Sequence, residues 1–295
     1  MKKIIKFILL LLIFTTSLAF AKPKESTKFL LSSTSLKQGQ TLKADIYSKK
    51  KIKRATVYFN GRRFRCVKDD KYKKKGSHYF TYIGISRYQK PYSYGVKMIA
   101  TFQNGRRLVR NKKVKVSNGN FSTSRINLTG KKKKLSRNYS QLHKEAKLFG
   151  QRFRTFTRRK FFKKPFILPT KGKFTTPFGA YRIYNGRPGS RHSGLDIANK
   201  VGTPVVAANK GKIIVSDLFR CNGKSVMIDH GAGVMSVYTH LERCLVKKGQ
   251  WVKQGQVIGR MGKTGIATGA HVHWGMSVHN TRVDPMFWIK NSYKL

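Results

Sequence analysis

The sequence predicts an all-β protein in which two β domains are joined by a short helical connector. Its 295 residues are enough for two domains of ordinary size. Residues 27–118 contain short strand-like runs separated by turn signals, and residues 171–290 contain a second, more glycine-rich set. Many short strands with glycine turns are typical of antiparallel sheets. Residues 119–170, between the two sets, hold the one clear helical pattern.

The chain begins with the features of a secretory signal peptide over residues 1–21. Three lysines precede an apolar run, and Ala19, Phe20 and Ala21 form a small-x-small cleavage site. The apolar run is shorter than the roughly 20 residues that cross a bilayer, so an uncleaved anchor is the less favoured alternative. No later segment is apolar enough to span a membrane. We therefore expect an exported protein of the periplasm or cell envelope, or a secreted one.

The net charge is strongly positive. The chain has 64 lysine and arginine residues but only 10 aspartate and glutamate residues, a formal charge of +54 that becomes +51 without the three signal-peptide lysines. Such a surface attracts polyanions. For an exported protein these are peptidoglycan, other anionic envelope polymers or lipid headgroups; a solvated coat without a partner is the alternative. Because the sequence has no recognised nucleic-acid-binding module, we expect no specific nucleic acid partner.

Three cysteines are present: Cys66, Cys221 and Cys244. Export permits disulfides, and Cys221 with Cys244 is the candidate pair because both fall in the second domain. The sequence leaves open whether this bond forms. Cys66 would then be an unpaired thiol buried in the first domain. No CxxC or cysteine–histidine spacing predicts a structural zinc site.

The strand pattern of residues 27–118 predicts a small antiparallel β-sandwich. The runs TLKADIY, RATVYFN, HYFTYIGI, GVKMIATF and RRLVRNKKVKV are rich in β-branched and aromatic residues. Asn60-Gly61 and Asn104-Gly105 are hairpin turn signals between them. The strand spacing suits an immunoglobulin-like module of roughly 90 to 100 residues. We find no catalytic constellation in this domain.

Residues 119–170 form a basic connector. Four successive lysines precede Ser136, which can cap a helix with Tyr139, Leu142, Ala146 and Phe149 on one face. The following segment, RRKFFKKPFILP, interleaves basic and aromatic residues, a pattern that also suits a membrane surface or nucleic acid. We favour packing of its aromatic side chains on a neighbouring domain.

Three separated stretches of the second domain hold polar residues that apolar strands do not need. These residues are His192 and Asp196 in SRHSGLDIA, His240 in VYTHL, and His271 and His273 in AHVHWGM. Residues two apart in a strand point to the same face, so both histidines of HVH would share one space. A catalytic zinc site takes three nitrogen or oxygen ligands and keeps one open position. The first two residues and one HVH histidine would supply such a set, and the two remaining histidines would handle protons.

Together these stretches resemble the lysostaphin/LytM-type zinc metallopeptidases, the peptidoglycan endopeptidases of metallopeptidase family twenty-three. The resemblance extends from about Phe174 to Trp288 and rests on TPFGAYR, HSGLDIA, VMIDHGAGVMSVYTHL, HVHWGM and VDPMFW. The first domain is similar to the immunoglobulin-like module that precedes the catalytic domain in many exported members. The resemblance implies one Zn²⁺ per chain, with metal ligands His192, Asp196 and His273 and catalytic residues His240 and His271.

The implied activity is zinc-dependent hydrolysis of peptide bonds in peptidoglycan stems or cross-links, with a D,D-endopeptidase favoured. The alternative is a catalytically silent envelope protein on the same fold that binds peptidoglycan or activates an amidase. We favour the enzyme because all five site residues are present. The resemblance does not divide the catalytic roles between His240 and His271. The loop RCNGKS, which begins at Arg220, departs from the family pattern.

Several neighbouring polar residues have structural interpretations. We expect Asp229 to hydrogen-bond the backbone of its turn and Asp284 to be structural. We expect His279 to lie exposed at a strand end and not to bind metal. Arg182 and Arg191 are weaker candidates for contacts with a substrate carboxylate.

Overall fold

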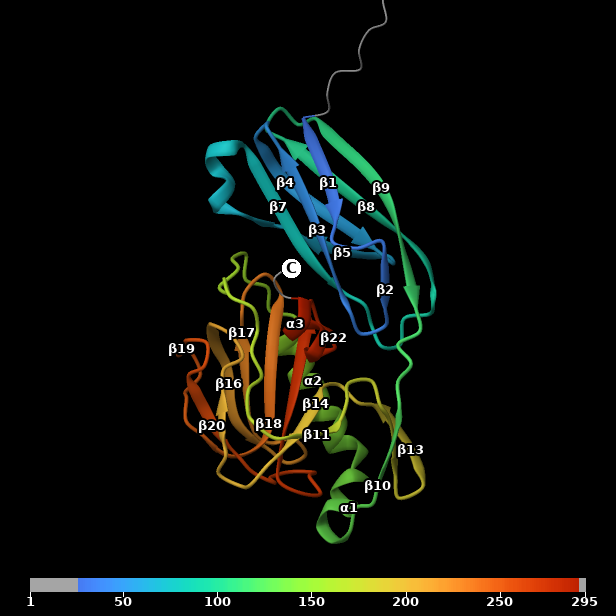
Figure 1. The fold of residues 1–295 in the computed structure, drawn as a ribbon, viewed down its shortest axis with the longest axis vertical. Coiled ribbons are helices and arrows are strands. Elements are labelled where there is room, and N and C mark those ends of the chain that lie inside the picture. Colours follow the sequence, from blue (N-terminus) through green and yellow to red (C-terminus); the bar gives the residue numbers. More distant parts are fainter. Residues whose placement is uncertain (1–25, 292–295) are drawn as a thin grey trace, which may run out of the picture.

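The computed structural model describes residues 26–291, so the predicted signal peptide lies outside the described residues. Two β-rich lobes lie one above the other, and the connector runs from the upper lobe down one side of the lower lobe (Figure 1). The all-β fold class is confirmed, since the helices of the described residues are few and short. Within residues 26–291, no helix has both the length and the apolar character needed to cross a membrane.

The N-terminal lobe is a sandwich of two mainly antiparallel sheets. Its elements are β1 (Thr27–Leu31), β2 (Ser35–Lys37), β3 (Thr41–Ser48), β4 (Ile52–Phe59), β5 (Arg62–Arg65), β6 (Val67–Lys68), a 3-10 turn (Asp70–Lys75), β7 (Ser77–Gly84), β8 (Tyr92–Phe102) and β9 (Arg107–Ser117). One sheet has the order β1-β3-β7-β6 and the other β2-β9-β8-β4-β5, with β2 parallel to β9. Fully buried side chains from both sheets, such as Leu42 and Val57, form one core. The predicted β-sandwich is therefore present, and its immunoglobulin-like class stays a prediction.

The β4–β5 hairpin shows how the sequence fixes a local turn. Asn60 has φ +46° and Gly61 has φ +72°, and the strands on either side pair in register. Positive φ at both central residues is the requirement of a type I′ turn, which explains the Asn-Gly pair.

The C-terminal lobe is built on one large, curled sheet. The strands of this lobe are β11 (Lys173–Thr176), β12 (Tyr181–Tyr184), β13 (Arg187–Arg191), β14 (Leu195–Ala198), β15 (Pro204–Val206), β16 (Gly211–Phe219), β17 (Gly223–Asp229), β18 (Val234–Cys244), β19 (Trp251–Val252), β20 (Val257–Met261), β21 (His271–Val278) and β22 (Thr281–Val283), followed by helix α3 (Pro285–Asn291). Strands β12 and β13 lie outside the large sheet and pair with each other in a separate small sheet. The main order is β11-β14-β21-β18-β17-β16-β19. A core that includes Ile197, Tyr238 and Trp274 fills the lobe.

The connector contributes elements that its sequence did not reveal. It contains β10 (Thr123–Ile126), α1 (Gly130–Ser136) and α2 (Tyr139–Phe153). The prediction of one helix capped by Ser136 is wrong, because the second helix begins after Asn138, whose side chain accepts the N–H of Gln141 at 3.0 Å. The predicted apolar face is only partly formed: Phe149 is buried and Leu142 is half-buried, but Ala146 is exposed. Tyr139 is 72% exposed, and the face that packs on the sheet carries Glu145 together with the phenylalanines.

The basic and aromatic segment after α2 packs against both lobes, as predicted. Phe162 and Phe166 are buried in the core of the C-terminal lobe, and Phe162 also stacks on Tyr82 of the N-terminal lobe with ring centroids 6.3 Å apart. Trp288 of α3 completes this contact, since its indole N–H donates to the Thr41 hydroxyl at 3.1 Å. The two lobes are therefore joined by a largely apolar interface in which the Trp288 indole N–H has a hydrogen-bond partner.

The structure also answers the expectations about His279 and about the cysteine pair Cys221 and Cys244. His279 does not lie exposed: its ring packs edge-on against Phe64 of the other lobe, with centroids 5.4 Å apart, and its carbonyl accepts a hydrogen bond from Arg62. The position at a strand end was correct, but that strand end meets the other lobe. All three cysteines are free, so no disulfide forms between Cys221 and Cys244.

Candidate metal centre and active site

Two neighbouring strands bring the predicted ligands together. β14 pairs antiparallel with β21, and their register places Asp196 directly beside His273. His192 lies four residues before Asp196 in the turn that leads into β14. One ligand atom from each of these three residues lies within 4.8 Å of the others. Strand pairing therefore unites residues that are separated by about 80 positions in the sequence.

The three ligand atoms converge on one point. His192 Nε2 and His273 Nδ1 are 2.8 Å apart, and they lie 3.0 Å and 2.8 Å from Asp196 Oδ1. His192 Nδ1 donates to the Pro177 carbonyl at 2.9 Å, which leaves the Nε2 lone pair facing this point. A cation bound between these three atoms would be contacted by all of them. Two imidazoles and one carboxylate form a donor set that suits zinc and leaves one coordination position open.

The charge state of the cluster suits a metal. Burial lowers the pKa of His273 to about 4 and also lowers the pKa of His192. Burial alone would raise the pKa of Asp196, but the hydrogen bonds and charges of the two histidines hold it well below its usual range. At neutral pH the set is therefore two neutral imidazoles and one carboxylate, the forms in which these side chains bind metal.

His240 and His271 lie beside the cluster, and in both rings Nδ1 contacts a backbone carbonyl. His240 Nδ1 donates to the Thr264 carbonyl at 2.8 Å, and His271 Nδ1 donates to the Gly269 carbonyl at 3.0 Å. In its neutral form each ring therefore carries its proton on Nδ1 and has its lone pair on Nε2. The ring centroids of His240 and His271 are 4.8 Å apart, and His271 Nε2 lies 3.9 Å from Asp196 Oδ1. Burial is the main cause that lowers the pKa of His240 to about 3, so this ring is neutral.

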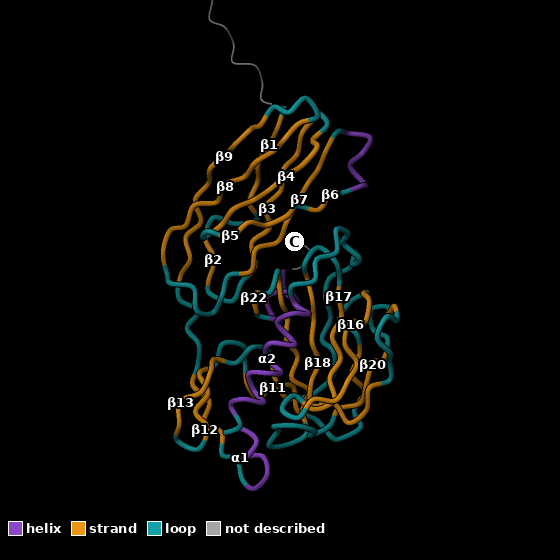
Figure 2. Tube along the Cα trace, turned by 180° about the vertical axis from the view of Figure 1, so that it is seen from behind, coloured by secondary structure: helices purple, strands orange, loops and turns teal. Residues whose placement is uncertain are grey.

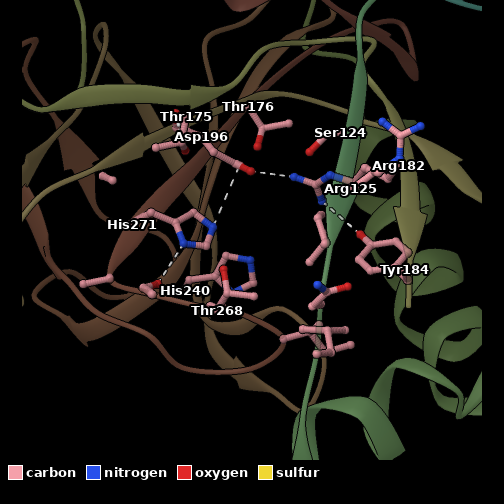
Figure 3. Close-up of a pocket in the computed structure, with 18 residues that line it drawn as sticks. Ser124, Arg125, Thr175, Thr176, Arg182, Tyr184, Asp196, His240, Thr268 and His271 are labelled. Atoms are coloured by element: carbon pink, nitrogen blue, oxygen red, sulfur yellow. Dashed lines mark hydrogen bonds and ion pairs between the residues drawn. The ribbon is translucent and has the colours of Figure 1, made fainter. Parts of the chain in front are cut away.

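A pocket of about 350 Å³ opens beside these histidines. Figure 3 shows His240, His271 and Asp196 on one side and residues of β10 and β12 on the other. The loop before β21 closes a further side. The lining residues with polar side chains are Ser124, Arg125, Asn127, Thr175, Thr176, Arg182, Tyr184, Asp196, His240, Thr268 and His271. One wall of the pocket therefore comes from the connector.

Arg182 binds the cluster itself. Its Nη2 donates to Asp196 Oδ2 at 2.5 Å, and its Nη1 donates to the Tyr184 hydroxyl at 3.2 Å. One carboxylate oxygen is thus held by the guanidinium, while the other faces the two histidines. The sequence suggested Arg182 as a contact for a substrate carboxylate, whereas in this structure it orients a carboxylate of the protein.

The structural interpretations of two aspartates agree with the structure. Asp229 Oδ1 accepts the N–H of Gly231 at 2.8 Å, and Asp284 Oδ1 accepts the N–H of Met286 at 2.9 Å at the start of α3. Sequence reasoning missed the contributions of the connector to the pocket. Only the parallel pairing of β10 with β12 places Ser124 and Arg125 there, and no local motif marks that pairing.

Comparisons with known proteins point to one family. The model of "Peptidase family M23" matches residues 190–285, which contain all five predicted site residues. The peptidoglycan DD-endopeptidase ShyB of Vibrio cholerae is 42% identical over 95 residues, which cover 32% of this chain and 22% of that protein. Lysostaphin of Staphylococcus simulans is 34% identical over 121 residues, which cover 39% of this chain and 24% of that protein.

The aligned part of the chain thus spans about a fifth to a quarter of these relatives. A solved structure extends the similarity beyond the C-terminal lobe. The chain superposes on a candidate peptidase M23 from Pseudomonas aeruginosa with a TM-score of 0.57 at 26% identity, covering 80% of this chain and 87% of that one.

Proposed function

We propose that the protein is an exported zinc endopeptidase that cleaves peptide bonds in peptidoglycan, because the model of peptidase family M23 matches residues 190–285. The observation that carries the proposal is the convergence of His192, Asp196 and His273 with two unliganded histidines beside them. We assign residues 171–290 as the catalytic domain, 119–170 as the connector and 27–118 as an N-terminal β-sandwich module. The names of the Vibrio relatives favour D,D-cross-links as the bonds that are cut.

In this proposal His192, Asp196 and His273 would hold one zinc ion per chain, through the three atoms that face one another in the cluster. When bound there, zinc would polarise the scissile carbonyl and lower the pKa of a water molecule. Arg182 keeps the carboxylate oriented from its other oxygen. The hydrogen bond to the Pro177 carbonyl fixes the tautomer of His192, as outer-shell partners of metal ligands commonly do.

His240 and His271 handle the protons of the reaction. Because their Nδ1 atoms donate to backbone carbonyls, each ring offers Nε2 to the pocket as a proton acceptor. One ring takes a proton from the attacking water. A protonated ring then stabilises the negative charge that develops on the carbonyl oxygen, or donates to the leaving amine. The peptide lies in the 350 Å³ pocket between these rings and the connector strand β10.

Digestion of purified sacculi tests this function. The mature protein is incubated with sacculi, with and without a chelator, and the products are identified by mass spectrometry. We expect cleaved cross-links without chelator, none with it, and recovery when zinc is added back. Cleavage that is indifferent to the chelator would contradict the zinc mechanism. A zinc-loaded protein that binds sacculi without cleaving them would support the silent envelope protein instead.

A further inference from the structure

Glu145 is a buried carboxylate of the connector and lies outside the segment that matches the family model. Only 2% of the surface of Glu145 is exposed to solvent. It accepts hydrogen bonds from the N–H of Cys221 at 2.9 Å, from the N–H of Asn222 at 3.1 Å, and from the side-chain amides of Asn222 and Gln141 at 2.8 Å and 2.9 Å. Burial alone would raise the pKa of Glu145, but these hydrogen bonds lower it. The side chain is therefore an ionised group bound by neutral donors.

The turn that receives Glu145 is the RCNGKS loop, the segment that departs from the family pattern. Consecutive backbone N–H groups of Cys221 and Asn222 point at one carboxylate, an arrangement that binds anions. A buried carboxylate is costly unless it is fully hydrogen-bonded. Figure 2 shows α2 running along the C-terminal lobe. Phe149 and Phe153 already anchor this helix on the sheet, because they are buried in one apolar cluster with Val215, Met227 and Val237. Anchoring of the helix therefore does not by itself require an ionised group.

The same turn holds the backbone of His240. The N–H of His240 donates to the Asn222 carbonyl at 3.0 Å. His240 has φ +64°, a left-handed conformation that is costly for a residue other than glycine. It lies where the pairing of β17 with β18 changes register, opposite Ser225. Such a bulge turns a side chain in a new direction and needs external support, because the local ladder is interrupted.

The turn also supports the ring of His240 through a second loop. The Cys221 carbonyl accepts the N–H of Ile266 at 2.8 Å, and the N–H of Lys224 donates to the Thr264 hydroxyl at 3.1 Å. These contacts fix the loop whose Thr264 carbonyl accepts His240 Nδ1 at 2.8 Å. Both the backbone and the tautomer of His240 thus depend on the turn at Cys221.

We propose that Glu145 is a positioning residue for His240. It acts from the connector, through the Cys221–Asn222 turn, and keeps the His240 ring in the Nδ1-protonated form with Nε2 facing the pocket. The metal ligands lie on β14, β21 and the turn before β14, which Glu145 does not touch, so metal binding is independent of it. The catalytic step that Glu145 assists is the one assigned under the proposed function.

The test compares Glu145→Gln and Glu145→Ala with the wild type in the zinc-loaded full chain. The glutamine keeps the length and one acceptor oxygen, and the alanine removes all acceptors. We expect kcat on soluble cross-linked muropeptides to fall by about 10- to 100-fold, more in E145A than in E145Q, with KM unchanged, because small misplacements of a catalytic group have effects of this size. Zinc content should equal that of the wild type.

Nitrogen NMR of the imidazole rings gives a readout that does not need catalysis. The signals of His240 are identified by their absence in His240→Gln. In the wild type they should show one tautomer with the proton on Nδ1, and in E145A they should shift toward a mixture of tautomers. If the wild type cleaves no peptidoglycan, the proposed function fails while these signals still decide the role of Glu145.

Phe149→Leu is the matched control, since it loosens the same helix without removing the carboxylate. It should lower the thermal midpoint and leave kcat and the His240 signals unchanged. Wild-type kcat and His240 signals in E145Q and E145A would overturn the proposal. Loss of zinc in E145Q, or the same kcat loss in F149L at equal destabilisation, would also overturn it, because the role would then be structural. Where E145A does not fold, E145Q decides.

Discussion

The buried His230 should make the native state sensitive to acid. Its side chain is inaccessible to solvent, its Nδ1 donates to the Lys210 carbonyl at 2.8 Å, and its Nε2 lies 2.8 Å from the Ser236 hydroxyl. Burial lowers the pKa of His230 from 6.5 to about 4. In the unfolded chain the pKa returns to about 6.5. This difference corresponds to about 3 kcal/mol of unfolding free energy.

The direction follows from proton uptake. Above pH 6.5 the ring is neutral in both states, so it contributes no pH dependence. Between pH 6.5 and 4 the unfolded chain binds a proton that the native state excludes, so stability falls as the pH falls. The loss is complete below about pH 4, where the native ring is also protonated.

Urea unfolding of the wild type and His230→Gln between pH 7.5 and 4.5 measures this effect, with chelator present so that metal release adds nothing. Between pH 7.5 and 4.5 the unfolding free energy of the wild type should fall by about 2 to 3 kcal/mol more than that of the variant, because the other histidines contribute equally to both proteins. His143→Gln is the control: that side chain is exposed on α2, so the variant should follow the wild type. Parallel curves for the wild type and H230Q would refute the reasoning.

The other predictions concern the metal, the lobe interface and the thiols. His273→Ala should lose both zinc and activity, whereas His271→Ala should lose activity but keep most of its zinc; equal zinc loss, measured by atomic absorption, would contradict the division of roles. Trp288→Ala should cost about 3 to 5 kcal/mol in chemical denaturation, because a fully buried indole leaves a cavity between the lobes; a loss below about 1 kcal/mol would show that the interface is loose. Cys221 and Cys244 should both react with a thiol reagent in denaturant without prior reduction, and a disulfide would make reduction necessary.

Much of the candidate site could be predicted from the sequence because its signals are local. The i, i+2 spacing of His271 and His273 places both on one face of a strand, and the SRHSGLDIA stretch carries the other two ligand types. The structure adds the register of β14 with β21, which brings the Asp196 carboxylate within 2.8 Å of His273.

The errors arose where a long-range contact replaced a local tendency. The helical pattern after Ser136 predicted an apolar face, but packing buried Glu145 because a distant turn offers it neutral donors. His279 has the sequence context of an exposed strand end, but the second lobe covers it. In both cases the partner, the Cys221 turn for Glu145 and Phe64 for His279, is distant in sequence from the residue that it covers.

The sequence by itself determined the all-β class, the Asn-Gly hairpin and the residue types of the candidate metal cluster, since backbone preference and side-chain spacing act over a few residues. Only the tertiary structure decided that the connector forms a wall of the pocket, that Arg182 binds Asp196 and that Glu145 supports the turn behind His240. Those contacts join segments between 14 and 77 residues apart. Their formation depends on strand register and helix docking, which are set by the burial of the whole core.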